Sequence, residues 1–276
     1  MRGNITTPIA TVSPAEMAAL FVRAKFRDLT LGTATCFTIQ SEEQVYVVTN
    51  RHVVTGRDNV TNEVLNEHGA VPEALEVLFH VDVEPNSPWI FKRIELYYDN
   101  EPTWFEHPAL RRRADLVAIP IEHDPIIRLV PLSLDQPELY GSLHPTDIVS
   151  VIGYPFGKAI ENTWPIFSTG FVASNPALDF EGLPVFLIDC RARKGQSGSP
   201  VMPNTLSVAE DGTSPPALRG NRWIRVRKES TQLLGIYSGR ISAESDLGMV
   251  WRTDALRALV DHAAAGGARA RHPDYP

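Results

Sequence analysis

The chain of 276 residues contains only two cysteines, Cys36 and Cys190, and has no long run of apolar residues. A membrane-spanning helix needs roughly 20 consecutive apolar residues, so we expect no membrane partner. Two thiols without a disulfide framework are typical of a reducing compartment. The N-terminal residues 1–4 lack the apolar core of a secretory signal, and together these absences predict a cytoplasmic protein.

An excess of basic charge is also absent. The chain has 26 Lys and Arg against 33 Asp and Glu, a formal charge of −7, which gives no general attraction to nucleic acid. We interpret residues 111–113 (RRR) as a solvated loop before a strand. No glycine-rich phosphate loop is present, and His107, His123 and His144 lack the spacing of metal ligands. We therefore expect no cofactor, no metal and no nucleic-acid partner.

Short segments rich in Val, Ile, Thr and aromatic residues alternate with turn residues along most of the chain. This spacing predicts an all-β fold, an antiparallel barrel or sandwich. The first set of predicted strands is Phe21–Phe26, Gly32–Gln40, Val45–Asn50, Leu75–Val83, Ile90–Tyr98 and Leu116–Ile121. The second set is Asp147–Gly153, Pro165–Ser174, Val185–Cys190, Gly198–Met202, Arg222–Val226, Gln232–Ser238 and Gly248–Arg252.

Helices are predicted near the two ends of the chain. Residues 13–16 (SPAE) form a capping-box pattern with proline at the first helical position, which predicts a short helix. Thr253 is the predicted N-cap of an alanine-rich helix that runs to about residue 265, before two glycines.

Two segments between the predicted strands have a different composition. Prolines at 125, 131, 137 and 145 predict an extended linker. The polar stretch between Met202 and Gln232 predicts a mobile surface excursion, with a regulatory contact as the less favoured alternative.

Residues 195–200 (GQSGSP) and 47–54 (VVTNRHVV) indicate a serine nucleophile and its general base. A serine hydroxyl is a poor nucleophile at neutral pH, so it needs an imidazole within reach, and the imidazole needs an acceptor on its other nitrogen. We assign these roles to Ser197, His52 and Asp115, and we expect His52 at the end of a strand. Asp115 begins a short apolar strand, which separates it from the nearby aspartates 82, 99 and 124.

The chain order His52, Asp115, Ser197 differs from the Ser, Asp, His order of α/β-hydrolases. Ser199 also stands where the nucleophile elbow of that class has its last glycine. The structural alternatives are a glycine-rich turn that only joins two strands and an ordinary core histidine. Against them, Gly195 allows the N–H groups of residues 195 and 197 to point at one oxygen, so we predict an oxyanion hole there.

These segments, with residues 151–155 (VIGYP) and 234–239 (LGIYSG), resemble bacterial trypsin-like serine peptidases, including HtrA-type protease domains and glutamyl endopeptidases. The resemblance covers residues 32–250. It implies two six-stranded antiparallel Greek-key barrels, over 20–121 and 146–252, joined by a linker over 122–145 and followed by a helix over 253–265. It also implies a serine endopeptidase acting on protein or peptide substrates.

The resemblance further implies where the substrate binds. Ser238 supports the aspartate by a hydrogen bond, and residues 237–239, Tyr237, Ser238 and Gly239, pair with the substrate backbone. Arg191 and Ala192 form the base and wall of the primary pocket, with Arg240 near its mouth. None of these is a carboxylate, so a basic side chain before the scissile bond lacks a counter-charge. A small or aliphatic residue is favoured, with an acidic one as the alternative.

The residue before the nucleophile is Gln196, whereas zymogen-activated relatives have an aspartate that captures a new N-terminal ammonium. Activation by that ion pair is therefore not expected. The oxyanion hole is either preformed or ordered by a partner. Two alternatives to a constitutive enzyme follow: a protease gated by an activating or sensor protein, and an interaction module on a protease fold.

Overall fold

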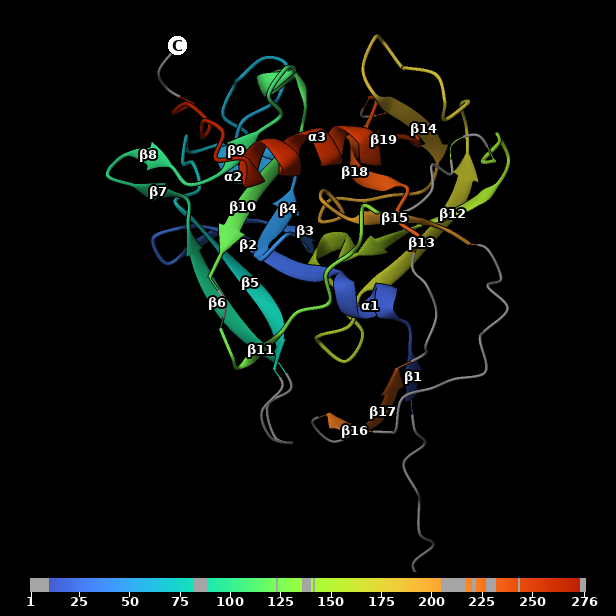
Figure 1. Ribbon diagram of the computed structural model, residues 1–276, viewed down its shortest axis with the longest axis horizontal. Coiled ribbons are helices and arrows are strands. Elements are labelled where there is room, and N and C mark those ends of the chain that lie inside the picture. Colours follow the sequence, from blue (N-terminus) through green and yellow to red (C-terminus); the bar gives the residue numbers. More distant parts are fainter. Residues whose placement is uncertain are drawn as a thin grey trace, which may run out of the picture.

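The computed structural model describes residues 10–81, 89–122, 124–135, 140, 142–204, 217–219, 222–226, 232–242 and 244–273. Strands predominate, and they gather into two halves with helix α3 across the top (Figure 1). The predicted all-β fold is confirmed at this level.

The C-terminal half is a closed barrel of six antiparallel strands in the order β12-β13-β14-β19-β18-β15. The strands are β12 (Ile148–Gly153), β13 (Ile166–Val172), β14 (Val185–Asp189), β15 (Pro200–Pro203), β18 (Gly235–Arg240) and β19 (Leu247–Arg252). Alternate apolar side chains fill its interior, among them Val151, Phe186 and Val250. The six-stranded barrel predicted for this half is confirmed.

The N-terminal half differs from the predicted six-stranded barrel. Its sheet has eight strands in the order β11-β5-β2-β3-β4-β10-β9, with β6 beside β5, and the pairings among the described residues do not close it. The strands are β2 (Leu20–Phe26), β3 (Leu29–Ser41), β4 (Gln44–Thr49), β5 (Ala74–Val81), β6 (Trp89–Glu95), β9 (Phe105–Glu106), β10 (Val117–Ile121) and β11 (Ile127–Arg128).

The strand predicted over Ile90–Tyr98 is two strands. It breaks at Leu96, whose side chain is fully buried in the core of this half. Beyond the break, β7 (Tyr97–Tyr98) pairs with β8 (Glu101–Pro102) as a separate small hairpin. The chain therefore leaves the edge of β5 after β6 and forms this hairpin.

Strand β3 is long and pairs with a different neighbour at each of its two ends. Residues 29–36 pair with β2, and residues 37–41 pair with β4. Its middle contacts the C-terminal half, because the Thr35 hydroxyl donates to the Gly195 carbonyl. This position matters for the site described below.

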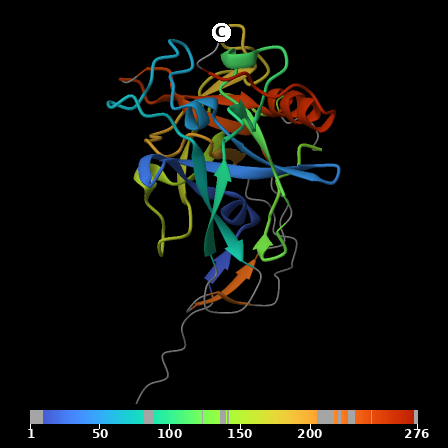
Figure 2. The same cartoon turned by 90° about the vertical axis from the view of Figure 1, so that its left-hand side faces the viewer.

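The prediction that Arg222–Val226 belongs to the second barrel is wrong. This segment, β17, pairs in parallel with β1 (Ala10–Val12) and antiparallel with β16 (Ala217–Arg219) in a separate sheet. Figure 2 shows this sheet beyond the end of the two halves. The barrel is already closed by other strands, so it offers no free edge. The rest of the predicted excursion, 205–216, 220–221 and 227–231, lies outside the described residues.

The N-terminal helix α1 (Pro14–Ala18) begins with the predicted capping box: the Glu16 N–H donates to Ser13 Oγ at 3.2 Å and the Ser13 N–H donates to Glu16 Oε2 at 2.6 Å. No helix in the described part of the chain is long and apolar enough to cross a membrane.

The C-terminal helix α3 spans Thr253–Ala264, but Thr253 is not its N-cap. Arg252 holds that position without a side-chain hydrogen bond, and the Tyr140 hydroxyl from the linker accepts the Thr253 N–H at 2.6 Å. Leu256 and Val260 of α3 share one core cluster with Val48 of the first half and Ile236 of the second. The helix thus packs against both halves.

Candidate active site

His52 lies on a short helix, not at a strand end as the sequence suggested. Helix α2 (Arg51–Thr55) starts directly after β4 and ends at Gly56, whose φ of 61° is left-handed. Strands β4 and β10 are antiparallel with Thr49 opposite Val117. This register carries Asp115, which precedes β10, to the side of α2.

Asp115 and His52 are joined by two hydrogen bonds. His52 Nδ1 lies 2.7 Å from Asp115 Oδ2, and the His52 backbone N–H donates to Asp115 Oδ1 at 3.0 Å. The Asn50 side chain donates to the Asp115 carbonyl at 2.8 Å. Asp115 is 7% exposed, so its carboxylate is held in one orientation next to the imidazole.

The environment of His52 raises its pKa above the ordinary value of 6.5. Burial lowers the pKa, but the charge of Asp115 and its hydrogen bond raise it, and the charge of Asp58 adds to them. The attraction to carboxylates therefore outweighs desolvation, and the imidazolium is stabilised relative to an isolated histidine.

A buried ion pair that the sequence did not reveal holds α2 in place. Arg51 Nε lies 2.8 Å from Glu106 Oε1, with side chains 5% and 11% exposed. Glu106 is on β9, opposite Val117 of β10. A desolvated pair of this kind is sensitive to loss of either partner, so it links the element that carries His52 to the strand beside Asp115.

Ser197 lies on a loop that is fastened to β3 of the other half. The Thr35 hydroxyl donates to the Gly195 carbonyl at 2.9 Å, and the Thr35 N–H donates to the Ser197 carbonyl at 2.9 Å. A side chain at Gly198 would come within 2.0 Å of the Thr35 carbonyl. Thr35 is fully buried, and nothing in the sequence pattern pointed to it.

The peptide between Lys194 and Gly195 has a defined orientation. The Phe156 N–H donates to the Lys194 carbonyl at 2.6 Å, and no cis peptide occurs in the described chain. Because the C=O and N–H of a trans peptide point in opposite directions, the Gly195 N–H points away from Phe156. Neither it nor the Ser197 N–H donates to an acceptor within the described residues.

Gly195 is required for this orientation on two counts. Its φ is 96°, and a Cβ there would lie 2.3 Å from the Tyr154 carbonyl. Gln196 supports the same turn: it is fully buried, its Oε1 accepts the Arg193 N–H at 2.7 Å, and its Nε2 donates to Ser168 Oγ at 2.8 Å. Gln196, the residue before Ser197, is thus held by hydrogen bonds between uncharged groups.

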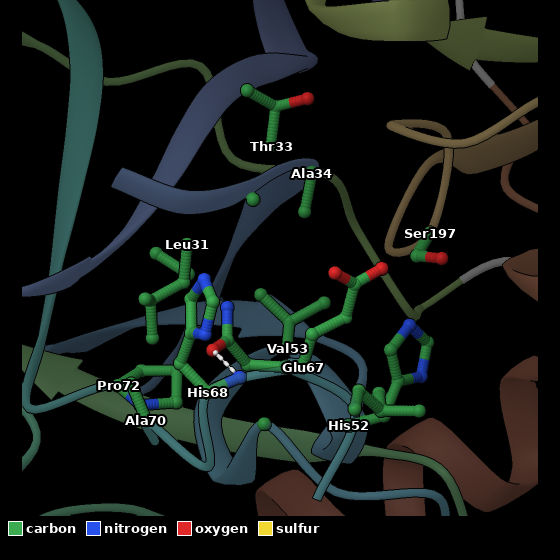
Figure 3. Close-up of a pocket in the computed structure, with 15 residues that line it drawn as sticks. Leu31, Thr33, Ala34, His52, Val53, Glu67, His68, Ala70, Pro72 and Ser197 are labelled. Carbon is green, nitrogen blue, oxygen red and sulfur yellow. Dashed lines mark hydrogen bonds between the residues drawn. The ribbon is translucent and has the colours of Figure 1, made fainter. Parts of the chain in front are cut away.

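Ser197 and His52 line the same cavity, of about 390 Å³, and lie together at one end of it (Figure 3). No hydrogen bond joins the Ser197 hydroxyl to His52 in the described part of the structure. Catalytic hydrogen bonds are often long without substrate and tighten when it binds.

The residues expected to bind substrate differ in their exposure to solvent and do not all lie at one surface. Tyr237 and Ala192 are buried in the core of the C-terminal barrel, whereas Arg191 and Arg240 are exposed. Ser238 is 7% exposed, and within the described residues it makes no hydrogen bond to Asp115.

The Tyr237 ring lies against Gly248, where a Cβ would be 2.5 Å from it, and open space adjoins Gly239. A carboxylate that the spacing did not suggest, Asp246, lies in this region at 3.4 Å from Arg193 Nη1. Its charge is therefore already paired.

Across the described residues, no group of three or more His, Cys, Asp or Glu side chains could hold a metal ion. The Nδ1 of His107 accepts the N–H groups of Ala109 and Leu110, and burial lowers the pKa of His107. His144 is exposed beside Asp147, and His123 lies outside the described residues.

A family model described as a trypsin-like peptidase domain matches residues 34–209, which include His52, Asp115 and Ser197. The chain belongs to the trypsin-like peptidase family. Comparison with curated proteins by sequence finds no match.

Solved structures of two proteases share this fold. A serine endoprotease from Yersinia pestis is 14% identical with a TM-score of 0.50, over 90% of this chain and 63% of that one. The HtrA-type protease AlgW, with a tripeptide, is 15% identical with a TM-score of 0.51, over 90% of this chain and 60% of that one. This peptidase chain thus spans about three fifths of the length of these two.

Proposed function

We propose that this chain is a serine endopeptidase that hydrolyses protein or peptide substrates through an acyl-enzyme on Ser197. The observation that carries the proposal is that His52, whose Nδ1 lies 2.7 Å from Asp115 Oδ2, lines one cavity with a serine on a loop from the other half. A carboxylate-bound imidazole beside an accessible hydroxyl is the arrangement that activates serine as a nucleophile.

The chemistry follows from the positions of these groups. His52 takes the Ser197 proton as Oγ attacks the substrate carbonyl, while Asp115 keeps the imidazole in the required tautomer and stabilises the imidazolium. The developing oxyanion accepts hydrogen bonds from the backbone N–H groups of Gly195 and Ser197. His52 then gives its proton to the leaving amine, and water attacks the acyl-enzyme by the reverse of these steps.

The orientation of the Gly195 N–H supports a site that needs no partner to become competent. The alternatives are a protease gated by an activating or sensor protein and an interaction module without activity. Treating the purified chain with a fluorophosphonate probe separates them, because only a competent site reacts quickly. We expect labelling at Ser197, retained in Ser199→Ala and lost in His52→Ala. An unlabelled wild-type chain would favour the alternatives.

The pH dependence of kcat/KM should show a rising limb with an apparent pKa above 6.5, the ordinary value of histidine. The base form of His52 is needed, and its pKa is raised, so activity is lost as the pH falls through that raised value. In Asp115→Asn the limb should move to lower pH, because the charge of Asp115 no longer opposes the effect of burial on the pKa of His52. A limb that stays in place in this variant would mean that another group titrates.

A peptide library should show best cleavage after small or aliphatic residues. Tyr237 and Ala192 carry no charge to attract a basic side chain, and the Asp246 carboxylate already pairs with Arg193. Best cleavage after Arg or Lys would contradict this assignment. Best cleavage after Glu or Asp, lost in Arg191→Ala or Arg240→Ala, would favour the acidic alternative.

A further inference from the structure

The cavity beside Ser197 extends away from the C-terminal barrel. Its lining, apart from Ser197, comes from β2, β3, α2 and the segment between α2 and β5. In Figure 3, Ser197 and His52 occupy one end, and Leu31, Ala70 and Pro72 occupy the other. Ala192 and Tyr237, expected on the other side of the scissile bond, do not line it.

The far wall of this cavity is the loop of residues 56–72, which is held closed by its own contacts. The Leu65 N–H donates to the Gly56 carbonyl at 2.8 Å, and the Asp58 N–H donates to the Glu63 carbonyl at 2.8 Å. A side chain at Gly56 would come within 2.5 Å of the Pro72 ring, so the two ends of the loop are in contact. The wall therefore exists before any ligand binds.

Seven of the thirteen side chains that line the cavity are apolar: Ala24, Leu31, Ala34, Val53, Leu65, Ala70 and Pro72. Leu65 is 56% exposed although it faces this space, so an apolar ligand would remove leucine surface from water. The Glu67 carboxylate projects towards the Ser197 end (Figure 3). This apolar part of the lining favours an apolar side chain.

The chemistry of the reaction decides which part of a substrate reaches this cavity. The leaving amine must receive its proton from His52, so the segment after the scissile bond starts beside the imidazole. The cavity also starts there and continues along Val53 and Gly56 of α2 and its end. The segment before the bond lies on the opposite side of Ser197.

We propose that this cavity is a leaving-side subsite that selects substrates with a bulky aliphatic or aromatic residue directly after the scissile bond, with Leu65 as a specificity residue. The inference rests on the proposed peptidase function. It assigns part of the selectivity to the 56–72 loop, in addition to the residues of the C-terminal half that we expect to bind the substrate before the scissile bond.

The subsite can be tested directly by measuring how the acyl-enzyme divides between reaction with an added amine and reaction with water. Ser197 Oγ attacks the carbonyl carbon of a peptide thioester ending in alanine and gives its proton to His52. The C–S bond breaks, the thiol leaves with that proton, and amino-acid amides then compete with water for the acyl-enzyme. The amine nitrogen bonds to the acyl carbon and gives a proton to His52, and the bond to Ser197 Oγ breaks as Oγ regains that proton. The ratio of peptide to acid formed per unit of added amide reports binding on the leaving side, independently of how fast acylation occurs.

Leucinamide should exceed glycinamide in this ratio by about tenfold or more, the scale of a side chain entering an apolar pocket. Leu65→Ala should reduce that preference by about threefold or more. Val60→Ala, an 88% exposed position on the same loop that does not line the cavity, should leave the preference unchanged.

Equal ratios for leucinamide and glycinamide, or an unaltered preference in Leu65→Ala, would overturn the subsite while leaving the peptidase assignment intact. Preference for argininamide that disappears in Glu67→Gln would also overturn it and assign a cationic ligand. If the thioester forms no acyl-enzyme at all, the proposed function fails, and the subsite fails with it.

Discussion

Replacing Ser197 by alanine is expected to abolish peptide hydrolysis and fluorophosphonate labelling without unfolding the protein. Removal of the nucleophile of such a triad lowers turnover by about 10⁶. The substitution deletes one hydroxyl and leaves the backbone contacts of the loop, in which the Ser197 carbonyl accepts the Thr35 N–H at 2.9 Å. Peptidase assays and thermal unfolding of the same preparation provide the measurement.

The neighbouring serine is the matched control for this variant. Ser199 is fully buried, and its hydroxyl has no hydrogen-bond partner in the described structure, so Ser199→Ala should keep activity. Retention of activity within about tenfold of wild type in Ser197→Ala would show that the nucleophile is another residue.

Asp115→Asn should give a folded enzyme whose turnover at neutral pH is lower by about 10⁴. The amide has nearly the shape of the carboxylate but can present an N–H to His52 Nδ1, which favours the wrong tautomer of the imidazole. It also carries no charge to stabilise the imidazolium. Steady-state kinetics with a peptide substrate, together with circular dichroism, would measure both parts of the expectation.

Asp124→Asn is the control, because Asp124 Oδ2 lies 2.6 Å from Lys92 Nζ in a partly exposed ion pair, and neither residue lines the cavity beside Ser197. Ion pairs that remain accessible to solvent contribute little to stability, so this variant should behave as wild type. A loss of less than about tenfold in Asp115→Asn would remove Asp115 from the proposed triad and redirect attention to Asp99 or Asp124.

The chemical types at the site could be read from the sequence because each is specified by a short segment. Residues 195–200 and 47–54 contain a serine in a glycine turn and a histidine after an apolar run, and residues 113–121 place an aspartate before a strand. The family match agrees with the resemblance found from these segments. Short segments rich in Val, Ile, Thr and aromatic residues, bounded by turn residues, also predicted most strands, since these side chains fit a pleated surface that is buried on one face.

The sequence did not show which strands pair with each other or where the shortest helix forms. Segment 222–226 has a strand pattern, yet it pairs with residues 10–12 because the barrel has no open edge for it. Helix α2 has only five residues, too few for a helical period to be visible, so His52 was expected at a strand end.

The local segments of the sequence therefore determined the strand-rich fold, its family and the residue types offered for catalysis. The tertiary structure alone decided how those residues are held. The Thr35 hydroxyl reaches the Gly195 carbonyl across 160 positions of sequence, and the buried Arg51–Glu106 pair and the cavity wall at Leu65 arise only when distant elements pack. Side-chain periodicity records which face of a strand is buried, but contacts between remote segments depend on packing and carry no local pattern.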